Sequence, residues 1–385
     1  MNNEVKNVPE LRFPEFSGEW KEKELGQCTN LITKGTTPKD KSGKGTINYI
    51  KVENIYNGKI NPRMKININE HEGYLKRSKL EANDILFSIA GTLGRTAVVN
   101  KSHLPANTNQ ALAIIRGYEF ETNFLITTLG GHAVAKYIRK NPTVGAQPNL
   151  SLNQVSKLII NTPSKNEQQK IGDFFSKLDQ QIELEEQKLA KLEEQKKGYM
   201  QKIFSQELRF KDENGNDYPE WEIKKLMQIA KVKTGSKNVQ DNIQDGKFKF
   251  FDRSVEVKYL NTFDFDETAI IYPGEGSKFL PRYFSGKYSL HQRAYSIYDI
   301  NINNNYLYYY LSLQNNHFLK YAVGSTVKSL RMSGFDKLKV MVPKNSEQEK
   351  IGDFFNELDE LIEKQSSKIG VLKQRKKGFL QKMFV

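Results

Sequence analysis

The chain has 385 residues, enough for two or three domains, and its 59 Lys and Arg against 45 Asp and Glu give a formal net charge of +14. An apolar fraction of 37% excludes global disorder, and the single cysteine, Cys28, excludes a disulfide framework and a thiolate zinc cluster. No run approaches the ~20 apolar residues of a membrane span, and residues 1–16 lack the apolar run of a signal peptide. We therefore expect a cytoplasmic protein whose positive charge binds a polyanion, with nucleic acid ahead of a membrane surface.

Residues 1–162 make up the first predicted globular block. A Leu-Arg-Phe segment at residues 11–13 leads through a Pro/Gly turn to Trp20. Alternating apolar residues at 84–99 predict strands, and residues 123–139 predict a short helical stretch. The block is therefore expected to be α+β.

Residues 163–204 are repeated as residues 343–384, with identical residues at 21 of 42 positions and no gap. Each copy begins with a proline, which is tolerated before a helix, and continues with an unbroken alternation of four- and three-residue apolar steps. A 3.5-residue period over more than four heptads predicts a coiled coil, although two amphipathic helices packed on separate cores would give a similar pattern.

The predicted seam residues are Ile171, Phe175, Leu178, Ile182, Leu189, Leu192, Tyr199 and Ile203 in the first copy, and Ile351, Phe355, Leu358, Ile362, Ile369, Leu372, Phe379 and Met383 in the second. Four polar residues interrupt the stripes, and we expect them to set helix register rather than to bind a ligand. They are Glu185, Lys196, Gln365 and Lys376.

Residues 208–342 repeat the skeleton of the first block with little of its sequence. Leu-Arg-Phe at residues 208–210 again precedes a tryptophan, Trp221, and residues 288–298 predict strands. A helical stretch at residues 305–321 carries several tyrosines, which are expected in the core rather than as a base-stacking platform.

The order of these parts defines the expected architecture. The first helix leads from globule one to globule two and the second must return, so we expect an antiparallel intramolecular coiled coil and approximate two-fold internal symmetry. The predicted domains are globule one (1–162), a central helix (163–207), globule two (208–342) and a distal helix (343–385). The fold class is α+β.

Charge and length connect this architecture to DNA. The helical segments 163–207 and 343–385 carry net charges of −1 and +2, which leaves +13 for the rest of the chain. The stripe from Ile171 to Ile203 spans about 48 Å at ~1.5 Å per residue, which limits the gap between two read half-sites to about 14 base pairs at ~3.4 Å each. Two basic globules on a stiff spacer therefore predict a bipartite target with an unread gap.

The two copies also agree outside the stripe, which suggests that the same partner binds twice. Recent duplication is the alternative, but it would have left the globules alike as well. The candidate partner-docking residues are Glu167, Gln168, Lys170, Asp173, Lys197, Gln201 and Lys202, with Glu347, Gln348, Lys350, Asp353, Lys377, Gln381 and Lys382 in the second copy.

These motifs resemble the specificity subunit of type I restriction-modification enzymes over essentially the whole chain. The paired E-Q-x-K-I-G-D-F-F segments (167–175, 347–355) and the paired K-K-G-[YF]-[ML]-Q-K-[IM]-F ends (196–204, 376–384) carry the resemblance. The resemblance implies two domains that each read half of a double-stranded DNA site and helices that dock two modification subunits, which methylate adenine with S-adenosylmethionine. Restriction subunits, a motor and nuclease using ATP and magnesium, would join that core.

Catalytic and metal-binding motifs were sought in this chain and are not found. A [DNS]-P-P-[FYW] tetrad for a flipped adenine, an F-x-G-x-G cofactor loop and a phosphate-binding G-x-x-x-x-G-K-[ST] loop are all missing, and the five histidines lack metal-ligand spacing. We expect no catalytic residue, no metal site and no cofactor of its own. A coiled-coil scaffold joining two protein-binding domains is the alternative function.

Candidate DNA contacts are residues able to donate to base edges or phosphates. In globule one they are Lys34, Thr36, Lys39, Lys41, Lys44, Lys51, Asn54, Arg95, Asn107, Asn109 and Gln110. In globule two they are Lys233, Ser236, Lys237, Lys247, Lys249, Arg253, Lys278, Arg282, His291, Gln292, Arg293, Lys328 and Arg331. For any single residue, a solvated surface position or a satisfied turn is an equally good interpretation.

Overall fold

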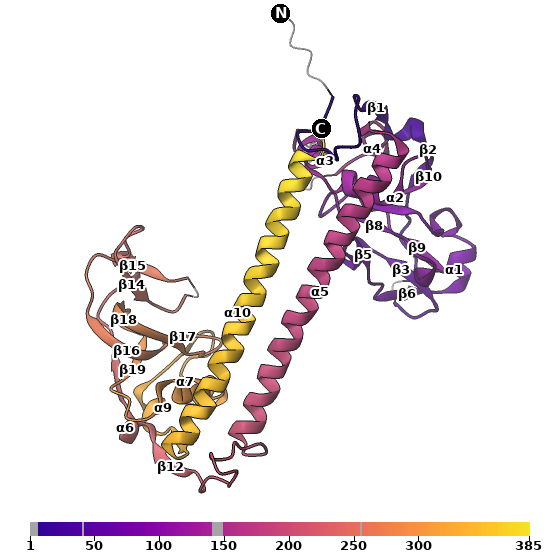
Figure 1. The fold of residues 1–385 in the computed structure, drawn as a ribbon. Helices are drawn as coiled ribbons and strands as arrows, with labels where there is room; N and C mark the ends of the chain where they lie inside the picture. The colour runs from indigo at the N-terminus through magenta and orange to yellow at the C-terminus, as the bar shows by residue number, and fades with distance from the viewer. Residues whose placement is uncertain (1–6, 41, 141–148, 255) are drawn as a thin grey trace, which may run out of the picture. The chain divides into compact units, whose positions relative to one another are not determined.

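The computed structural model describes residues 7–40, 42–140, 149–254 and 256–385, and it divides into two compact units (Figure 1). Unit 1 comprises residues 1–186 and 367–385, and unit 2 comprises residues 187–366. Each unit contains one globule, part of helix α5 (Lys165–Phe204) and part of helix α10 (Asn345–Lys382). Among the described residues, no helix combines the length and apolar character needed to cross a membrane.

Globule one is built on two sheets. The antiparallel sheet consists, in spatial order, of β2 (Thr29–Lys34), β10 (Leu112–Tyr118), β7 (Ile85–Ser88) and β8 (Thr96–Val98). The second sheet consists of β6 (Met64–Ile66), β3 (Ile47–Ile50) and β9 (Ala106–Thr108), and a small ladder pairs β4 (Ile55–Tyr56) with β5 (Lys59–Ile60). Its helices are α1 (Ile68–Glu72), α2 (Thr122–Leu129), α3 (His132–Lys140) and α4 (Leu152–Ser156). Finally, β1 (Lys21–Glu24) pairs with β11 (Ile159–Thr162), directly before α5.

Globule two has one larger sheet. In spatial order it consists of β13 (Lys231–Thr234), β19 (Tyr295–Tyr298), β16 (Phe265–Tyr272), β18 (Arg282–Leu290), β14 (Phe248–Phe251) and β15 (Lys258–Leu260). Its two-stranded ladders pair β12 (Glu222–Lys225) with β21 (Lys339–Val342), and β17 (Glu275–Gly276) with β20 (Lys328–Ser329). Its helices are α6 (Leu226–Ile229), α7 (Asn304–Ser312), α8 (Asn315–Tyr321) and α9 (Met332–Asp336).

The two globules share a frame, and the α+β prediction is confirmed. Strands β2, β10 and β7 of globule one correspond in order and direction to β13, β19 and β16 of globule two. Likewise, the ladder β1–β11 corresponds to β12–β21. Each predicted helical stretch is a pair of shorter helices, α2 with α3 and α7 with α8.

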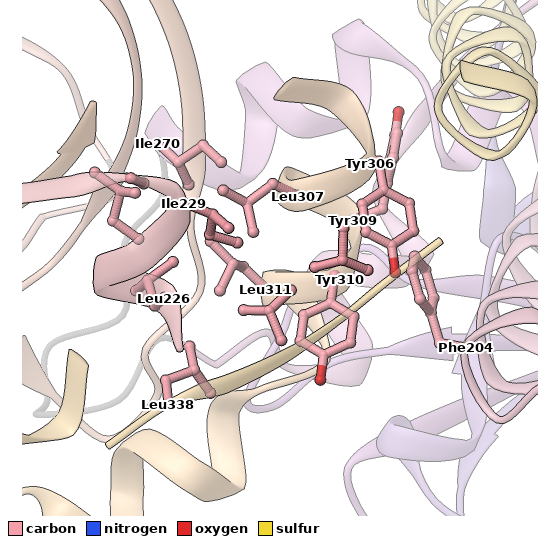
Figure 2. Packing of buried hydrophobic residues seen from close by; sticks show 14 of the residues in the cluster. Phe204, Leu226, Ile229, Ile270, Tyr306, Leu307, Tyr309, Tyr310, Leu311 and Leu338 are labelled. Atoms are coloured by element: carbon pink, nitrogen blue, oxygen red, sulfur yellow. The ribbon is translucent and has the colours of Figure 1, made fainter. Parts of the chain in front are cut away.

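The tyrosines of α7 belong to the core of globule two, as predicted. Tyr306 and Tyr309 are almost fully buried, in a cluster with apolar residues of α6, α9 and α10. Figure 2 shows Phe204, the last residue of α5, beside Tyr306 and Tyr310, and its ring centroid lies 5.7 Å from each of theirs. The end of α5 is thus anchored in this core.

Helices α5 and α10 pair in antiparallel fashion inside each unit. In unit 1, Leu178 and Ile182 pack on Leu372, and Glu185 forms an ion pair with Lys368 at 2.8 Å. In unit 2, the ring centroids of Tyr199 and Phe354 lie 5.2 Å apart, and Lys196 forms an ion pair with Asp359 at 2.5 Å. The corresponding ion pair in unit 1 joins Lys376 to Asp179. Three of the four polar stripe residues therefore form ion pairs between the helices.

The ends of the two stripes enter the globule cores rather than a helix–helix seam. Ile171, Phe175 and Met383 belong to the core of globule one, and Ile203, Ile351 and Phe355 to that of globule two. Between these ends, Ile369 is buried, whereas Tyr199 remains 37% exposed. The other predicted seam residues there are half-buried, namely Leu189, Leu192, Leu358, Ile362 and Phe379.

A buried ion pair fixes globule one to the start of α5. Arg12 donates from Nε and Nη2 to the two carboxylate oxygens of Glu167, each at 2.7 Å, and Glu167 is only 1% exposed. This hydrogen bonding raises the pKa of Arg12 above its usual value. The adjacent Gln168 donates to the Pro163 carbonyl at 2.9 Å and accepts from the Glu121 backbone N–H at 3.0 Å. The Leu-Arg-Phe segment at residues 11–13 is therefore held against the helix.

The same arrangement occurs in globule two. Arg209 donates from Nη2 and Nε to Glu347 at 2.8 and 3.1 Å, and Glu347 is fully buried. Gln348 donates to the Pro343 carbonyl at 2.7 Å and accepts from the Asn303 backbone N–H at 2.8 Å. We call the two arrangements the Arg–Glu clamps, Arg12–Glu167 in unit 1 and Arg209–Glu347 in unit 2.

Candidate nucleic-acid interface

A cleft of about 300 Å³ lies in globule two, where several of the predicted DNA contacts meet. Four segments line it: the one between β13 and β14, the turn after β14, the turn that leads into β17 and the turn between β18 and β19. The lining residues are Val239, Asp252, Arg253, Gly274, Glu275, His291, Gln292 and Arg293. We call this region the candidate cleft.

Glu275 holds two arginines in the candidate cleft. Its carboxylate accepts from Nη1 of Arg293 and lies 3.5 Å from Nη1 of Arg253. The Glu275 side chain is 13% exposed, while those of Arg253 and Arg293 are 64% and 63% exposed. The carboxylate is therefore recessed, and the two guanidinium groups project to the surface with hydrogen-bond donors available for a ligand.

The turn between β18 and β19 is braced by hydrogen bonds. Gln292 donates from its backbone N–H to the Lys237 carbonyl at 3.0 Å and from Nε2 to Asn238 at 2.8 Å. The backbone N–H of Arg293 donates to Nδ1 of His291 at 3.1 Å. Partial burial lowers the pKa of His291, which favours the neutral ring at pH 7. The neutral imidazole is the form that accepts this hydrogen bond.

Globule one brings together the corresponding turns, but around different residues. The backbone N–H of Thr36 donates to the Thr108 carbonyl at 2.9 Å, and the Thr37 hydroxyl donates to Gln110. This places Thr36 beside the predicted contacts Asn109 and Gln110. Lys39 lies nearby, with Nζ 4.7 Å from the ring centroid of Tyr74. The predicted contact Lys41 lies outside the described residues.

Two predicted base readers in globule one are wrong because their side chains are buried in structural hydrogen bonds. Asn54 is 5% exposed, and its Oδ1 accepts from the Lys51 backbone N–H at 2.9 Å. Asn107 is fully buried and donates to the Leu75 carbonyl and the Ser78 hydroxyl at 2.9 and 3.1 Å. An amide that already satisfies its own chain in the interior cannot reach a DNA groove.

Two arginines also serve their own globule. Arg95 donates from Nη1 to the carbonyls of Val52 and Ile55 at 3.1 and 3.0 Å. Arg282 donates from Nη2 to the Ser254 carbonyl. Both guanidinium groups tie loops together, and both arginines are less exposed than Arg253 and Arg293.

The remaining candidates in globule two differ in how far their charges are already engaged. Nζ of Lys233 lies 3.9 Å from the ring centroids of both Phe265 and Tyr298 and forms an ion pair with Glu267 at 2.5 Å. The charge of Lys233 is therefore engaged within the globule. Lys237 forms an ion pair with Asp264 at 3.3 Å. Exposed candidates of both globules are Lys34, Lys39, Lys44, Gln110, Ser236, Lys247, Lys249, Lys278 and Arg331, while Lys51 and Lys328 are half-buried.

The predicted partner-docking surface needs correction at the Arg–Glu clamps. Glu167, Gln168, Glu347 and Gln348 are at most 2% exposed and bind their own globules, so their agreement between the copies has an intramolecular cause. Lys170 forms an ion pair with Glu15, and Lys350 donates to the Lys211 carbonyl at 2.8 Å. Exposed docking candidates on the helices include Lys197, Gln201, Lys202, Asp353, Lys377, Gln381 and Lys382, and Asp173 is half-buried.

Sequence reasoning missed Glu275 and the clamp arginines. Glu275 lies between Gly274 and Gly276 and is not among the predicted contacts. Arg12 and Arg209 belong to the repeated Leu-Arg-Phe segments. The recurrence of an arginine ahead of each tryptophan was the sequence signal that could have identified them. Within the described residues, no group of three or more His, Cys, Asp or Glu side chains could hold a metal ion.

Comparison with known proteins gives relatives from type I restriction systems. The EcoDI specificity subunit of Escherichia coli is 28% identical over 162 residues, which covers 42% of this chain and 36% of that protein. The aligned segment is thus about a third of that relative's length. The crystal structure of a type I restriction-modification S subunit from M. genitalium matches with a TM-score of 0.64 at 16% identity, covering 98% of this chain and 99% of the other.

A second solved chain comes from work on complex assembly and conformational transition of the type I R-M system. It matches with a TM-score of 0.59 at 16% identity and covers 95% of this chain and 97% of that one. Both likenesses show the fold. The family model described as "Type I restriction modification DNA specificity domain" matches residues 17–194 and again residues 218–373. With most of its residues matched, in two consecutive copies, the chain belongs to the type I restriction modification DNA specificity domain family.

Proposed function

We propose that this chain is the non-catalytic DNA-specificity subunit of a type I restriction-modification complex in the cytoplasm. Residues 1–162 and 208–342 each read one half of a bipartite site in double-stranded DNA. The helical segments 163–207 and 343–385 act as spacer and dock two modification subunits. The observation that carries the proposal is the double match of a DNA specificity family to two globules with one frame and different charged surfaces.

The chemistry in this proposal belongs to partner subunits. Two modification subunits methylate adenine with S-adenosylmethionine, and restriction subunits add ATP- and magnesium-dependent translocation and cleavage. This chain contributes the choice of site. Its net charge of +14 favours contact with the phosphates of DNA, and its base-reading side chains discriminate between sequences.

Single-molecule sequencing of adenine methylation tests the proposal. Cells that express the partner subunits are compared with and without this chain. We expect one bipartite motif, methylated on both strands, that disappears when the chain is absent. An unchanged methylome in cells where the complex is assembled would contradict the proposal and favour the coiled-coil scaffold.

A further inference from the structure

We propose that Glu275 is a specificity-determining positioning residue of globule two: it holds Arg293 and Arg253 as a pair that reads the guanine of a G·C base pair in the half-site. This inference rests on the proposed function and adds to it the kind of base pair that the candidate cleft recognises. It also assigns a role to an acidic residue in a globule whose surface otherwise favours DNA through positive charge.

The recessed carboxylate gives the two arginines a defined position. Long arginine side chains on a surface lose rotamer freedom when they bind, and an ion pair formed beforehand reduces that loss. Glu275 engages Nη1 of Arg293 and approaches Nη1 of Arg253, while more than half of each arginine side chain stays exposed. A guanidinium group has five N–H donors, so contact through one nitrogen leaves donors for a base edge.

The backbone around Glu275 is itself held in place. A Cβ atom on Gly274 would lie 1.2 Å from the Arg293 carbonyl oxygen, so the two backbones are in direct contact and only glycine fits. Glu275 begins β17, which pairs with β20 at Ser329, and the Leu330 backbone N–H donates to the Gly274 carbonyl at 2.8 Å. Carboxylate and arginine are therefore presented from two turns that cannot move apart freely.

The charges in the cleft favour a base edge over a phosphate. A phosphate would be repelled by Glu275, whereas Asp252, which also lines the cleft and is 3% exposed, is neutralised by its ion pair with Lys258. Guanine presents two neutral acceptors, O6 and N7, that match an arginine fork. Two exposed arginines held by a recessed carboxylate therefore suit the guanine of a G·C pair in the major groove.

The test compares methylation motifs directed by the full chain assembled with its partner subunits. Glu275→Gln keeps the shape and removes the charge that positions the arginines, and Arg293→Lys keeps the charge and removes the fork. Both variants should relax one G·C position in one half of the motif, lowering discrimination at that position about tenfold and leaving the other half intact. The matched control Lys278→Gln removes an exposed cation that does not line the cleft, and it should lower methylation at all sites similarly.

Thermal melting of each complex separates a reading defect from a folding defect. If Glu275→Gln melts early, Arg293→Lys decides, because it leaves the carboxylate and the strand pairing in place. An unchanged motif in Arg293→Lys, or uniform loss over all positions with wild-type melting, would overturn the inference and leave the proposed function standing. If the wild-type chain directs no bipartite motif at all, the proposed function fails and this inference falls with it.

Discussion

Globule one and globule two differ least where they meet the helices and most where their turns gather exposed polar groups. The Arg–Glu clamps use the same residue types with nearly the same hydrogen bonds in both units. The turns that gather candidate DNA contacts instead carry Thr37 and Gln110 in one globule and the Arg–Glu–Arg cluster in the other. Agreement at the clamps therefore reflects intramolecular fixation, and divergence falls on the surfaces proposed to read different half-sites.

Breaking a clamp should have the largest effect on stability. Arg12→Ala leaves Glu167 buried without its cationic partner, and Arg209→Ala does the same to Glu347, so each should cost about 3 kcal/mol. Chemical denaturation of the full chain measures the loss of stability. Hydrogen exchange should then localise that loss to the unit that contains the altered clamp. Lys34→Ala, at an exposed position, is the control and should change stability by less than about 0.5 kcal/mol. If Arg12→Ala destabilised unit 2, this would contradict the prediction that each clamp stabilises its own unit.

Two glycines of helix α5 should respond in opposite directions when they are replaced by alanine. A Cβ on Gly172 would lie 2.4 Å from Glu121 Oε2 and 2.9 Å from the Phe124 backbone nitrogen, whereas one on Gly198 would meet nothing within 4 Å. Gly172→Ala should therefore destabilise the chain by about 2 kcal/mol through overpacking, while Gly198→Ala should stabilise it by up to about 1 kcal/mol. Melting temperatures of the two variants check the prediction, and equal signs would contradict it.

The two tryptophans sharpen the comparison at a smaller scale. Trp221 Nε1 donates to Glu347 at 3.1 Å, whereas Trp20 Nε1 is buried without a hydrogen-bond partner among the described residues. Replacement by Phe removes similar volume in both places but a charge-assisted hydrogen bond only at Trp221. Trp221→Phe should therefore cost about 1–2 kcal/mol more than Trp20→Phe in denaturant titrations. Equal losses would show that this bond contributes nothing to the clamp.

The helix–helix ion pairs should have the smallest effect. Lys196 pairs with Asp359 and Lys376 with Asp179, and all four side chains are at least partly exposed. Lys196→Met and Lys376→Met should each cost less than about 1 kcal/mol. Raising the salt concentration should shrink the difference from the unaltered chain, because partly exposed pairs are screened. A larger, salt-independent loss would mean that packing of the lysine stem matters more than its charge.

The sequence was sufficient for the architecture because the information lies in periodic and repeated residues. The middle of the heptad stripe packs α5 on α10 and the tyrosines of α7 lie in a core, as predicted, whereas the ends of the stripe enter the globule cores. Single contact residues were less predictable. Nothing local distinguishes the buried amide of Asn107 from the half-exposed one of Asn109, since burial is decided by β9 lying beside β3 in the folded globule.

The same limit explains why the sequence predicts partner binding for all residues that agree between the two copies outside the apolar stripe. Glu167 carries a charge and precedes the apolar stripe, which suggests a surface position, but in the fold its buried carboxylate pairs with Arg12. Glu275 could not be predicted, because a single acidic residue in a turn of a basic globule belongs to no periodic pattern. Its significance depends on Arg253 and Arg293, which reach it from two other turns.

Unit 1 is assembled from the two ends of this sequence, which has a consequence for biosynthesis. The ring centroid of Phe384 lies 6.1 Å from that of Trp20 and 5.8 Å from that of Phe124, and Met383 is buried in the same core. A ribosome must therefore have passed the codon for Phe384 before the core of globule one can close, while residues 187–366 of unit 2 form one continuous stretch. The globule made first is expected to mature last. A stop codon a few codons before that of Met383 would then disrupt globule one, although the rest of that globule is encoded hundreds of codons upstream.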